Sequence, residues 1–130
     1  MIALDASALL DLLLQRPGAR ATLAAIGDRR SLQAPHLAET ELLNALRRWV
    51  RRGWISEDRA AEVLDDLAAL PLVLHPHSPL RPRVWALRHR LSAYDATYLA
   101  LAEALPATLV TADRGLADMA APTVSVVLAT

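Results

Sequence analysis

The chain opens with Met1–Leu9, MIALDASAL, in which a short apolar run, Ile2–Leu4, is followed at once by Asp5. The run is apolar without alternation, which indicates a strand buried on both faces, as in a parallel sheet. Ser7 is then expected to open a helix that runs to about Gln15 and buries a row of leucines. This strand-then-helix order, with an acid at the junction, sets the pattern for the rest of the chain.

The same alternation continues to the end of the chain. Short apolar strands are expected at residues 31–34, 72–74, 108–111 and 124–128. Helical segments are expected at 17–26, 37–52, 56–70, 79–91 and 94–105, with a helical turn at 116–119. No internal repeat or linker divides the 130 residues, a length suited to one domain. We therefore predict a single α/β domain over residues 1–130, with a mainly parallel central sheet of about five strands and helices on both faces.

The composition removes several classes of function. All 14 basic residues are arginine, so Schiff-base chemistry and a Walker A phosphate loop, both of which need lysine, are excluded. The chain has no cysteine, which excludes thiol nucleophiles, disulfides and cysteine-ligated zinc. No apolar run reaches the ~18 residues of a membrane span. Because no convincing targeting segment is present either, the cytoplasm is the expected location.

Four acids stand at positions that one fold can gather. Asp5 and Asp113 follow predicted strands, and in a parallel sheet ligands bind beyond the carboxyl ends of the strands, near the topological switch point. Asp95 lies at the start of a helix that is apolar almost all round, where an unpaired charge is costly. Glu41 borders the apolar arc of helix 37–52. Together they would form a carboxylate cage for a hard divalent cation.

Each acid also has a purely structural reading. Asp5 and Asp113 suit helix N-caps, Asp95 suits a first helical turn, and Glu41 suits a solvated helix surface. Glu39 competes with Glu41, although its place in the first turn favours a capping role. Hydroxyl and amide side chains expected to orient the acids or a bound water are Ser7, Asn44 and Thr111. None of the four histidines is expected to be a ligand.

With these motifs in place, the chain resembles the PIN-domain ribonucleases, specifically the VapC-type toxins of toxin–antitoxin pairs. The resemblance covers almost the full length and rests on four blocks in order: IALDASAL at 2–9, PHLAETELLNAL at 35–46, LSAYDATYLALAE at 91–103 and LVTADRGL at 109–116. Carried over position by position, the family's four acids fall on Asp5, Glu41, Asp95 and Asp113. The helix acid is Glu41 and not Glu39, because Glu41 directly precedes the LLNAL stretch.

The resemblance implies an endoribonuclease that depends on Mg²⁺ or Mn²⁺, a VapB-like antitoxin that neutralises it, and a homodimer. The alternatives are a catalytically inactive interaction module of the same fold and a general PIN nuclease that is no toxin. Phosphoacceptor domains of the receiver or haloacid-dehalogenase type also place acids at strand ends, but they normally use a lysine, which this chain lacks. The RNA target and the number of metals stay open, as does any role for Asp118.

Arginines and tryptophans offer a surface for RNA or for a partner. Arginines cluster at 47–52 and at 81–90, where they can contact RNA phosphates or form ordinary solvated helix faces. Arg114, next to Asp113, is the preferred single phosphate contact. Trp49 is expected in the core, and Trp54 is expected to be exposed and available to a partner.

Overall fold

The computed structural model, which describes residues 1–130, has at its centre one five-stranded sheet in the order β3-β2-β1-β4-β5. Every neighbouring pair of strands is parallel, and Leu4 of β1 lies opposite Val110 of β4. The strands are β1 Ile2–Leu4, β2 Leu32–Pro35, β3 Leu72–His75, β4 Thr108–Thr111 and β5 Val126–Leu128. The predicted α/β class with a five-stranded sheet is confirmed, and the sheet is parallel throughout.

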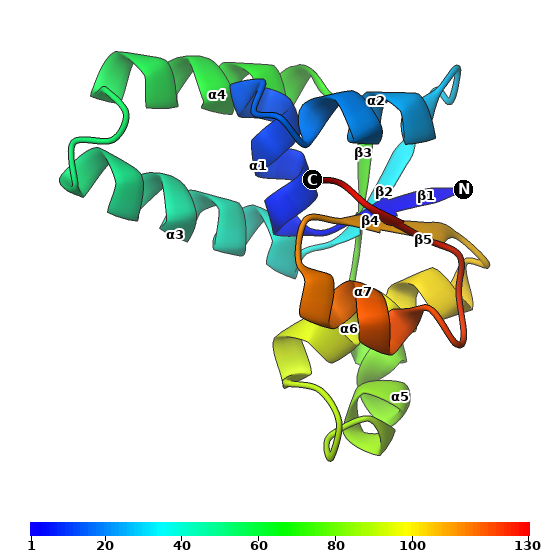
Figure 1. The fold of residues 1–130 in the computed structure, drawn as a ribbon. Coiled ribbons are helices and arrows are strands. Elements are labelled where there is room, and N and C mark those ends of the chain that lie inside the picture. The colour runs from blue at the N-terminus through cyan, green and yellow to red at the C-terminus, as the bar shows by residue number, and fades with distance from the viewer.

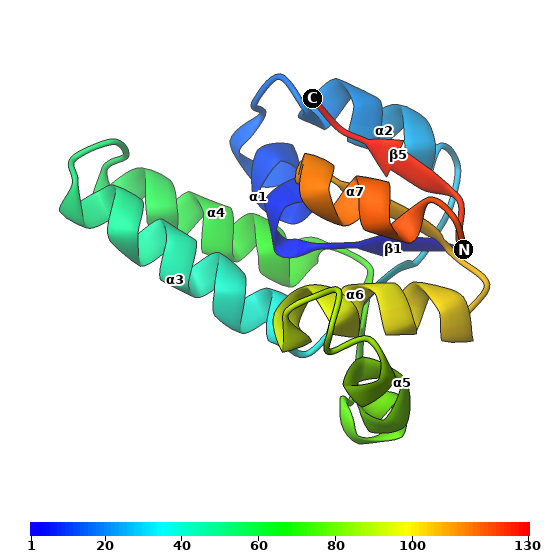
Figure 2. The same cartoon turned by 60° about the horizontal axis from the view of Figure 1, so that its bottom comes forward.

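Seven α-helices and one 3₁₀ turn connect the strands and cover both faces of the sheet. Figures 1 and 2 show α1 and α2 on one side, together with the α3–α4 hairpin, and α6 and α7 on the other. None of the helices is both long and apolar enough to cross a membrane. The helices are α1 Ala6–Leu14, α2 Ala19–Ile26, α3 Leu37–Arg51, α4 Glu57–Ala69, α5 Arg81–Ala86, α6 Ala93–Ala104 and α7 Arg114–Ala120, and the 3₁₀ turn is η1 Ser78–Leu80.

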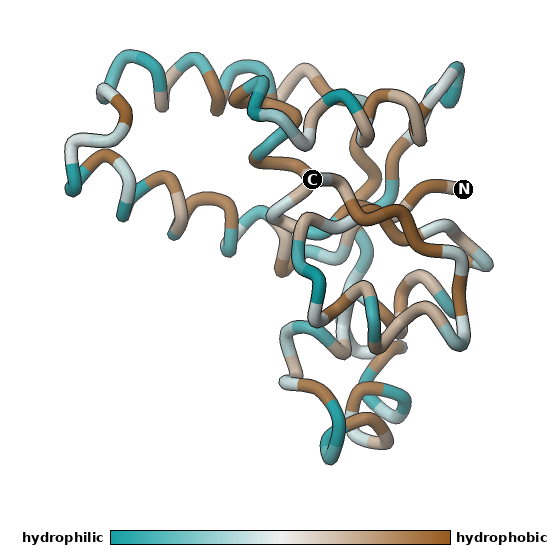
Figure 3. Tube along the Cα trace, in the orientation of Figure 1, coloured by the Kyte–Doolittle hydropathy of each residue, from teal (hydrophilic) through white to brown (hydrophobic).

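The core lies around the middle strands of the sheet. β1 is buried along its whole length and β4 along all but its first residue, as a strand covered on both faces requires. The edge strand β3 is more accessible to solvent: none of its residues is buried, and Val73 is exposed. Figure 3 shows the hydrophobic colour concentrated in the central strands, whereas hydrophilic and hydrophobic positions alternate along α3 and α4. The apolar central strands therefore hold the ends of β1 and β4 in fixed positions.

Helix α1 begins one residue earlier than predicted. Asp5, with an extended backbone, is the N-cap, and its Oδ1 accepts a 2.9 Å hydrogen bond from the Ala8 amide. Ser7 therefore lies inside the first turn rather than in front of it, and its hydroxyl is free to bond elsewhere. The cap fixes the Asp5 side chain at the carboxyl end of β1.

The helix expected over residues 79–91 is shorter in the structure. A 3₁₀ turn, η1, precedes α5, which ends at Ala86, and turns follow before α6. Pro79 and Pro82 cannot donate the hydrogen bonds of a continuous helix. After α5 the amides of Arg88 and Arg90 bond three residues back, which tightens the chain into 3₁₀-type turns. Of the apolar side chains in this segment only Leu80 and Leu87 are buried, so little packing holds a longer helix.

Helices α3 and α4 form a hairpin that projects beyond the sheet (Figures 1 and 2). Gly53, in the left-handed region with φ 72°, reverses the chain after α3, as its place after the helix predicts. Along α3, Leu42 and Leu46 are buried, but Leu43 is 47% exposed although the helical wheel places it in the apolar arc. Leu43 is exposed because α3 leaves the body of the protein and only a narrow stripe of it meets the core.

Candidate active site at the carboxyl ends of β1 and β4

Asp5 and Asp113 lie on either side of the topological switch point of the sheet. The chain moves from β1 to β2 in one direction and adds β4 on the opposite side of β1, so β1 and β4 flank the point where the winding reverses. Asp5 directly follows β1, and its amide bonds to the Val110 carbonyl of β4 at 3.2 Å. Asp113 comes two residues after β4 and caps α7, with Oδ1 accepting from the Leu116 amide at 3.2 Å.

Asp5 is almost fully buried, and both of its carboxylate oxygens are hydrogen-bonded. Oδ1 accepts from the Ser7 hydroxyl at 2.7 Å as well as from the Ala8 amide, and Oδ2 accepts from the Thr111 hydroxyl at 2.5 Å. The Ser7 hydroxyl in turn accepts from the Ala112 amide, and that of Thr111 accepts from the Asp113 amide, each at 2.9 Å. Two hydroxyls thus tie the Asp5 carboxylate to the segment that carries Asp113.

The Asp5 carboxyl holds its proton more tightly than an ordinary aspartate. Burial raises its pKa from the usual 3.8 to about 6, although hydrogen bonds from Thr111, Ala8 and Ser7 act in the opposite direction. The negative charge of Asp113 adds a smaller upward push to this pKa. A nearby cation would stabilise the ionised form of a buried carboxyl that otherwise ionises only near neutral pH.

Asp95 and Glu41 extend the cluster from two other helices. Asp95 lies in the first turn of α6, half-buried, and its pKa is raised by burial and by the charges of Asp113 and Glu41. Glu41, also half-buried on α3, accepts a 2.5 Å hydrogen bond from the Tyr98 hydroxyl of α6. The four acids therefore lie in one electrostatically coupled group at the carboxyl edge of the sheet, contributed by four separate segments.

Tyr98 is a member of the site that the sequence analysis did not identify. Its ring is buried at 3% exposure, and burial together with the adjacent Glu41 carboxylate raises the pKa of its hydroxyl far above the usual value. The expected partner of Glu41, Asn44, is exposed on α3 instead. A signal was present in the sequence, because Tyr98 lies three residues after Asp95 on the same helical face and a buried tyrosine hydroxyl needs a partner.

The remaining predicted residues lie around this cluster in different ways. Arg114 is the exposed first residue of α7, directly after Asp113, and Asp118 is exposed further along that helix. Glu39 is exposed in the first turn of α3, where its charge suits the helix dipole. Two of the histidines make hydrogen bonds within the fold: His77 Nε2 accepts from the Leu37 amide at 2.9 Å at the start of α3, and His75 bonds to Gln33 at 2.6 Å.

The donor set suits a hard cation, but the side chains are not a finished cage. Four carboxylates supply only oxygen ligands, which Mg²⁺ and Mn²⁺ prefer. None of the chain's three ion pairs involves Asp5 or Asp95, and burial, with the charge of Asp113 as a smaller cause, raises the pKa of both carboxyls. No three His, Asp or Glu side chains already surround one point at metal-ligating distances. The oxygen ligands and their negative charge thus fit a divalent ion, but the four side chains do not converge on one point.

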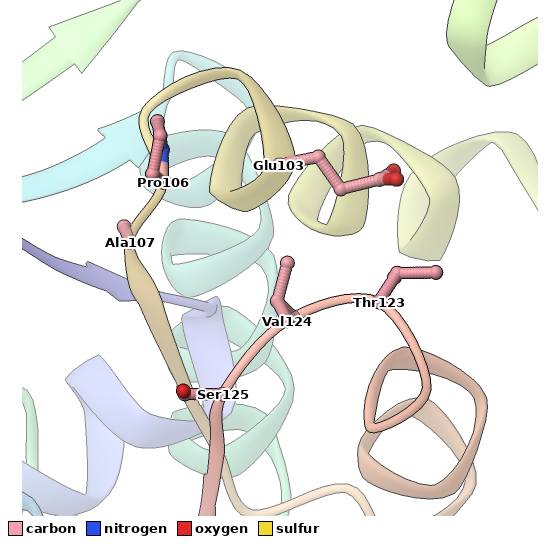
Figure 4. A pocket seen from close by; sticks show the side chains of 6 residues that line it. All are labelled: Glu103, Pro106, Ala107, Thr123, Val124 and Ser125. Carbon is pink, nitrogen blue, oxygen red and sulfur yellow. The ribbon is translucent and has the colours of Figure 1, made fainter.

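A separate hollow lies at the opposite edge of the sheet. It has a volume of about 420 Å³. Figure 4 shows Pro106 and Ala107, which precede β4, beside the loop 123–125 that precedes β5. Its one acid, Glu103, receives two hydrogen bonds from the Arg83 guanidinium, at 3.0 and 3.1 Å. Because this hollow opens at the amino ends of β4 and β5, it is not part of the acidic site.

Comparison with known proteins agrees with the fold. The family model described as PIN domain matches residues 2–122. The chain is 42% identical to the VapC ribonuclease Mb0985 of Mycobacterium bovis over 118 residues, 91% of this chain and 90% of that protein. It is also 42% identical to Ribonuclease VapC1 of Mycobacterium tuberculosis over 114 residues, which are 87% of this chain and 86% of that one.

A more distant relative and a solved structure extend the agreement. Ribonuclease VapC3 of Pyrobaculum aerophilum is 32% identical over 121 residues, covering 90% of this chain and 92% of that one. The crystal structure of PAE2754 from Pyrobaculum aerophilum superposes with a TM-score of 0.73 at 28% identity, covering 98% of this chain and 83% of that one. The chain therefore belongs to the PIN-domain family, within its VapC group.

Proposed function

We propose that this chain is an endoribonuclease that depends on Mg²⁺ or Mn²⁺ and hydrolyses RNA phosphodiester bonds. The observation that carries the proposal is the coupled group of acids, Asp5, Glu41, Asp95 and Asp113, at the switch point of the sheet. Support also comes from relatives that are named ribonucleases and that align with about nine-tenths of the chain. In the proposal these four acids are both the metal ligands and the catalytic residues.

The acids differ in how far they are already positioned. Asp5 is fixed by three hydrogen bonds, and Glu41 is held by one from Tyr98. Asp113 is exposed, with only Oδ1 engaged in capping α7, and Asp95 is half-buried, so neither side chain is packed into the core. Binding a divalent ion would relieve the mutual repulsion that raises the pKa of Asp95 and contributes to that of Asp5. This relief of repulsion is the driving force that we assign to metal binding.

The chain's own residues orient the site. Ser7 and Thr111 each hold one oxygen of the Asp5 carboxylate by a hydrogen bond, and Tyr98 keeps Glu41 turned toward α6. The bound cation supplies positive charge that polarises a phosphodiester and makes a nearby water more acidic. Arg114, exposed beside Asp113, is proposed to contact a phosphate of the substrate at the rim. Asn44, exposed one turn after Glu41, is at most a contact to a bound water or to RNA.

The biological role that fits this activity is that of a toxin. A VapB-like antitoxin, a homodimeric state and a cytoplasmic location, where the RNA is, belong to the same proposal. The alternatives are a general PIN nuclease with no antitoxin and a catalytically inactive PIN-fold interaction module. Retention of all four acids favours an active enzyme over the inactive module. A small reading frame for an antitoxin directly upstream would favour the toxin over the general nuclease.

The deciding experiment is RNA cleavage by the purified protein. We expect cleavage with Mg²⁺ or Mn²⁺, none with EDTA, and a loss of activity of at least a hundredfold in Asp5→Asn. Asn at position 5 keeps the N-cap of α1, so the variant is expected to fold. The matched control is Asp118→Asn, an exposed acid of α7, which is expected to retain activity. Cleavage that persists in EDTA, or that is equal in the two variants, would refute a metal site built on these acids.

A further inference from the structure

A hollow of about 380 Å³ begins at the acidic site and follows helix α3 away from it. Its lining includes Ser7, Glu41 and Ala112 at the acidic end, and Arg16, Arg48 and Trp49 further along. Glu41 and Arg48 are seven residues apart on one helix, a rise of ~10 Å at 1.5 Å per residue. The acidic site therefore opens onto a surface where arginine and tryptophan replace the acids.

Two further hollows continue this path. One, of about 440 Å³, shares Arg16 and Trp49 with the first and reaches Trp54 and Arg59 at the end of the α3–α4 hairpin. The other, of about 330 Å³, shares Arg48 with the first and is lined otherwise by Arg51 and Arg52. We call the three together the α3 track. Because adjacent hollows share lining residues, they follow one another along α3 from Glu41 to the end of the helix.

The last turns of α3, which border the far end of the track, carry positive charge that no ion pair neutralises. The three ion pairs of the chain join Arg16 to Asp11, Arg59 to Glu62 and Arg83 to Glu103. None of the arginines in the last turns of α3 takes part in one, although the protein as a whole has no net charge. These four arginines are Arg47, Arg48, Arg51 and Arg52. A ligand with several negative charges is the complement that such a cluster favours.

Two tryptophan rings lie beside this charge. Trp49 and Trp54 have ring centroids 6.3 Å apart, with an angle of 53° between the rings. Arg16 lies over Trp49 at 4.8 Å and Arg52 lies over Trp54 at 5.0 Å. Trp54 is 63% exposed, so one large flat aromatic surface faces solvent next to several guanidinium groups. Aromatic platforms combined with a basic groove are the pattern by which proteins bind single-stranded nucleic acid.

We propose that a single strand of RNA leaves the acidic site along the α3 track, with its phosphates at Arg48, Arg51 and Arg52 and an unpaired base stacked on Trp54. The inference rests on the proposed ribonuclease function and deepens it by naming a binding subsite beyond the acids. A base in a duplex cannot reach Trp54, because its faces are already stacked on its neighbours. The track therefore selects unpaired RNA, and the phosphate contacts carry no sequence preference.

The test measures binding separately from cleavage. In an Asp5→Asn background, a labelled single-stranded oligoribonucleotide is titrated at several KCl concentrations and followed by fluorescence anisotropy. Loss of one base stack predicts a weaker affinity for Trp54→Ala by roughly 5- to 100-fold. Trp54→Tyr, which keeps an aromatic face, is expected to stay close to the parent. Arg51→Ala is expected to lower the slope of log affinity against log salt by ~0.7, the value for one phosphate contact on a single strand.

The chain offers a matched control on α5. Trp85 is 67% exposed and lies under Arg88 at 4.5 Å, so it has the same chemistry as the Trp54–Arg52 pair but lines no part of the α3 track. Trp85→Ala and Arg88→Ala are expected to leave binding unchanged. A duplex of the same sequence is a second control, for which the effect of Trp54→Ala is expected to vanish. Both tryptophans are exposed, so neither truncation removes core packing.

The outcomes separate this inference from its competitors. Equal affinity of Trp54→Ala and Trp85→Ala for the single strand would overturn it, as would an equal effect on duplex RNA. An acidic protein segment is the competing occupant, and a polyglutamate peptide serves as its probe. Trp54-dependent binding of that peptide, combined with Trp54-independent binding of RNA, would assign the track to a protein. Failure of the ribonuclease proposal is read elsewhere, as absent cleavage by the wild-type protein with Mg²⁺, and leaves these binding results interpretable.

Discussion

The Tyr98 hydroxyl of α6 donates a 2.5 Å hydrogen bond to Oε1 of Glu41 on α3 and so joins the two helices that bring the third and second acids of the sequence to the site. Tyr98 is buried and Glu41 is half-buried, so the bond is largely shielded from water. A hydrogen bond to a charged group in such a place is stronger than one between neutral groups. Tyr98 therefore sets the direction in which the Glu41 carboxylate points.

Tyr98→Phe is expected to weaken the binding of Mn²⁺ and to slow RNA cleavage. Removing a residue that orients a metal ligand typically costs ~10- to 100-fold in metal affinity or activity. The lost bond to a charged acceptor is also expected to lower the free energy of unfolding by about 1.5–3 kcal/mol. Isothermal calorimetry with Mn²⁺, cleavage kinetics and urea unfolding measure the three effects. Tyr94→Phe is the control, because Tyr94 is exposed one turn earlier on α6, and equal behaviour of the two variants would contradict the role of Tyr98.

Glu41→Gln is expected to abolish metal-dependent cleavage, while Glu39→Gln leaves it within about twofold of the wild type. The two residues lie two positions apart on α3, but only Glu41 is hydrogen-bonded to Tyr98 and raises the pKa of Asp95 by its charge. Glu39 is exposed in the first turn, where its loss removes only a favourable helix-dipole contact of ~0.3–1 kcal/mol. Cleavage rates and thermal unfolding of both variants provide the comparison. The reverse pattern of activities would move the second acid of the site to Glu39.

The sequence could predict the elements that depend on local pattern. The apolar runs at β1 and β4, and the acids directly behind them, follow from the burial of a parallel sheet and from the place where its strands end. The N-cap reading of Asp5 is confirmed, whereas its role as a metal ligand stays a prediction. Oδ1 of Asp5 caps α1, while Thr111 bonds Oδ2 from the other side of the switch point.

What the sequence could not predict depends on contacts between distant segments. The pairing of Tyr98 with Glu41 spans 57 positions, and no spacing rule indicates which face of the buried helix α6 meets α3. Leu43 is exposed because the α3–α4 hairpin leaves the body of the protein, and a helical wheel contains no information on where a helix loses its cover. The early end of α5 likewise reflects a balance of weak tendencies, in which two prolines and a row of arginines outweigh the helical spacing.

Leu42→Ala and Leu43→Ala provide a direct test of how α3 is oriented. Leu42 is fully buried, so truncation is expected to lower the free energy of unfolding by about 2–5 kcal/mol through lost burial and a cavity. Leu43 is 47% exposed, so its truncation is expected to cost less than ~1 kcal/mol. Urea unfolding followed by tryptophan fluorescence gives both values. A larger cost for Leu43 than for Leu42 would mean that α3 is rotated relative to the orientation described above.

In the absence of metal, the stability of the protein is expected to depend on pH through Asp5. In the folded protein the pKa of Asp5 is raised by burial from 3.8 to about 6, so between these two values the folded state holds a proton that the unfolded chain has released. Stability changes with pH in proportion to the protons bound by the unfolded state minus those bound by the folded state. That difference is negative here, so the contribution of Asp5 to stability falls as pH rises from about 4 to 6 and is constant above.

Asp5→Asn removes this titration and isolates its size. The shift corresponds to an upper limit of about 3 kcal/mol, which we expect as a gain in the stability of the variant relative to wild type between pH 4 and pH 7 in EDTA. Urea unfolding at each pH measures the difference, and Asp118→Asn, at an exposed position, is the control that should follow the wild type. Adding Mn²⁺ at pH 7 should stabilise the wild type and not Asp5→Asn, because only the wild type presents the buried carboxylate to the ion. Parallel pH profiles of wild type and Asp5→Asn would instead mean that Asp5 titrates like an ordinary surface acid and that its burial does not store charge for a metal.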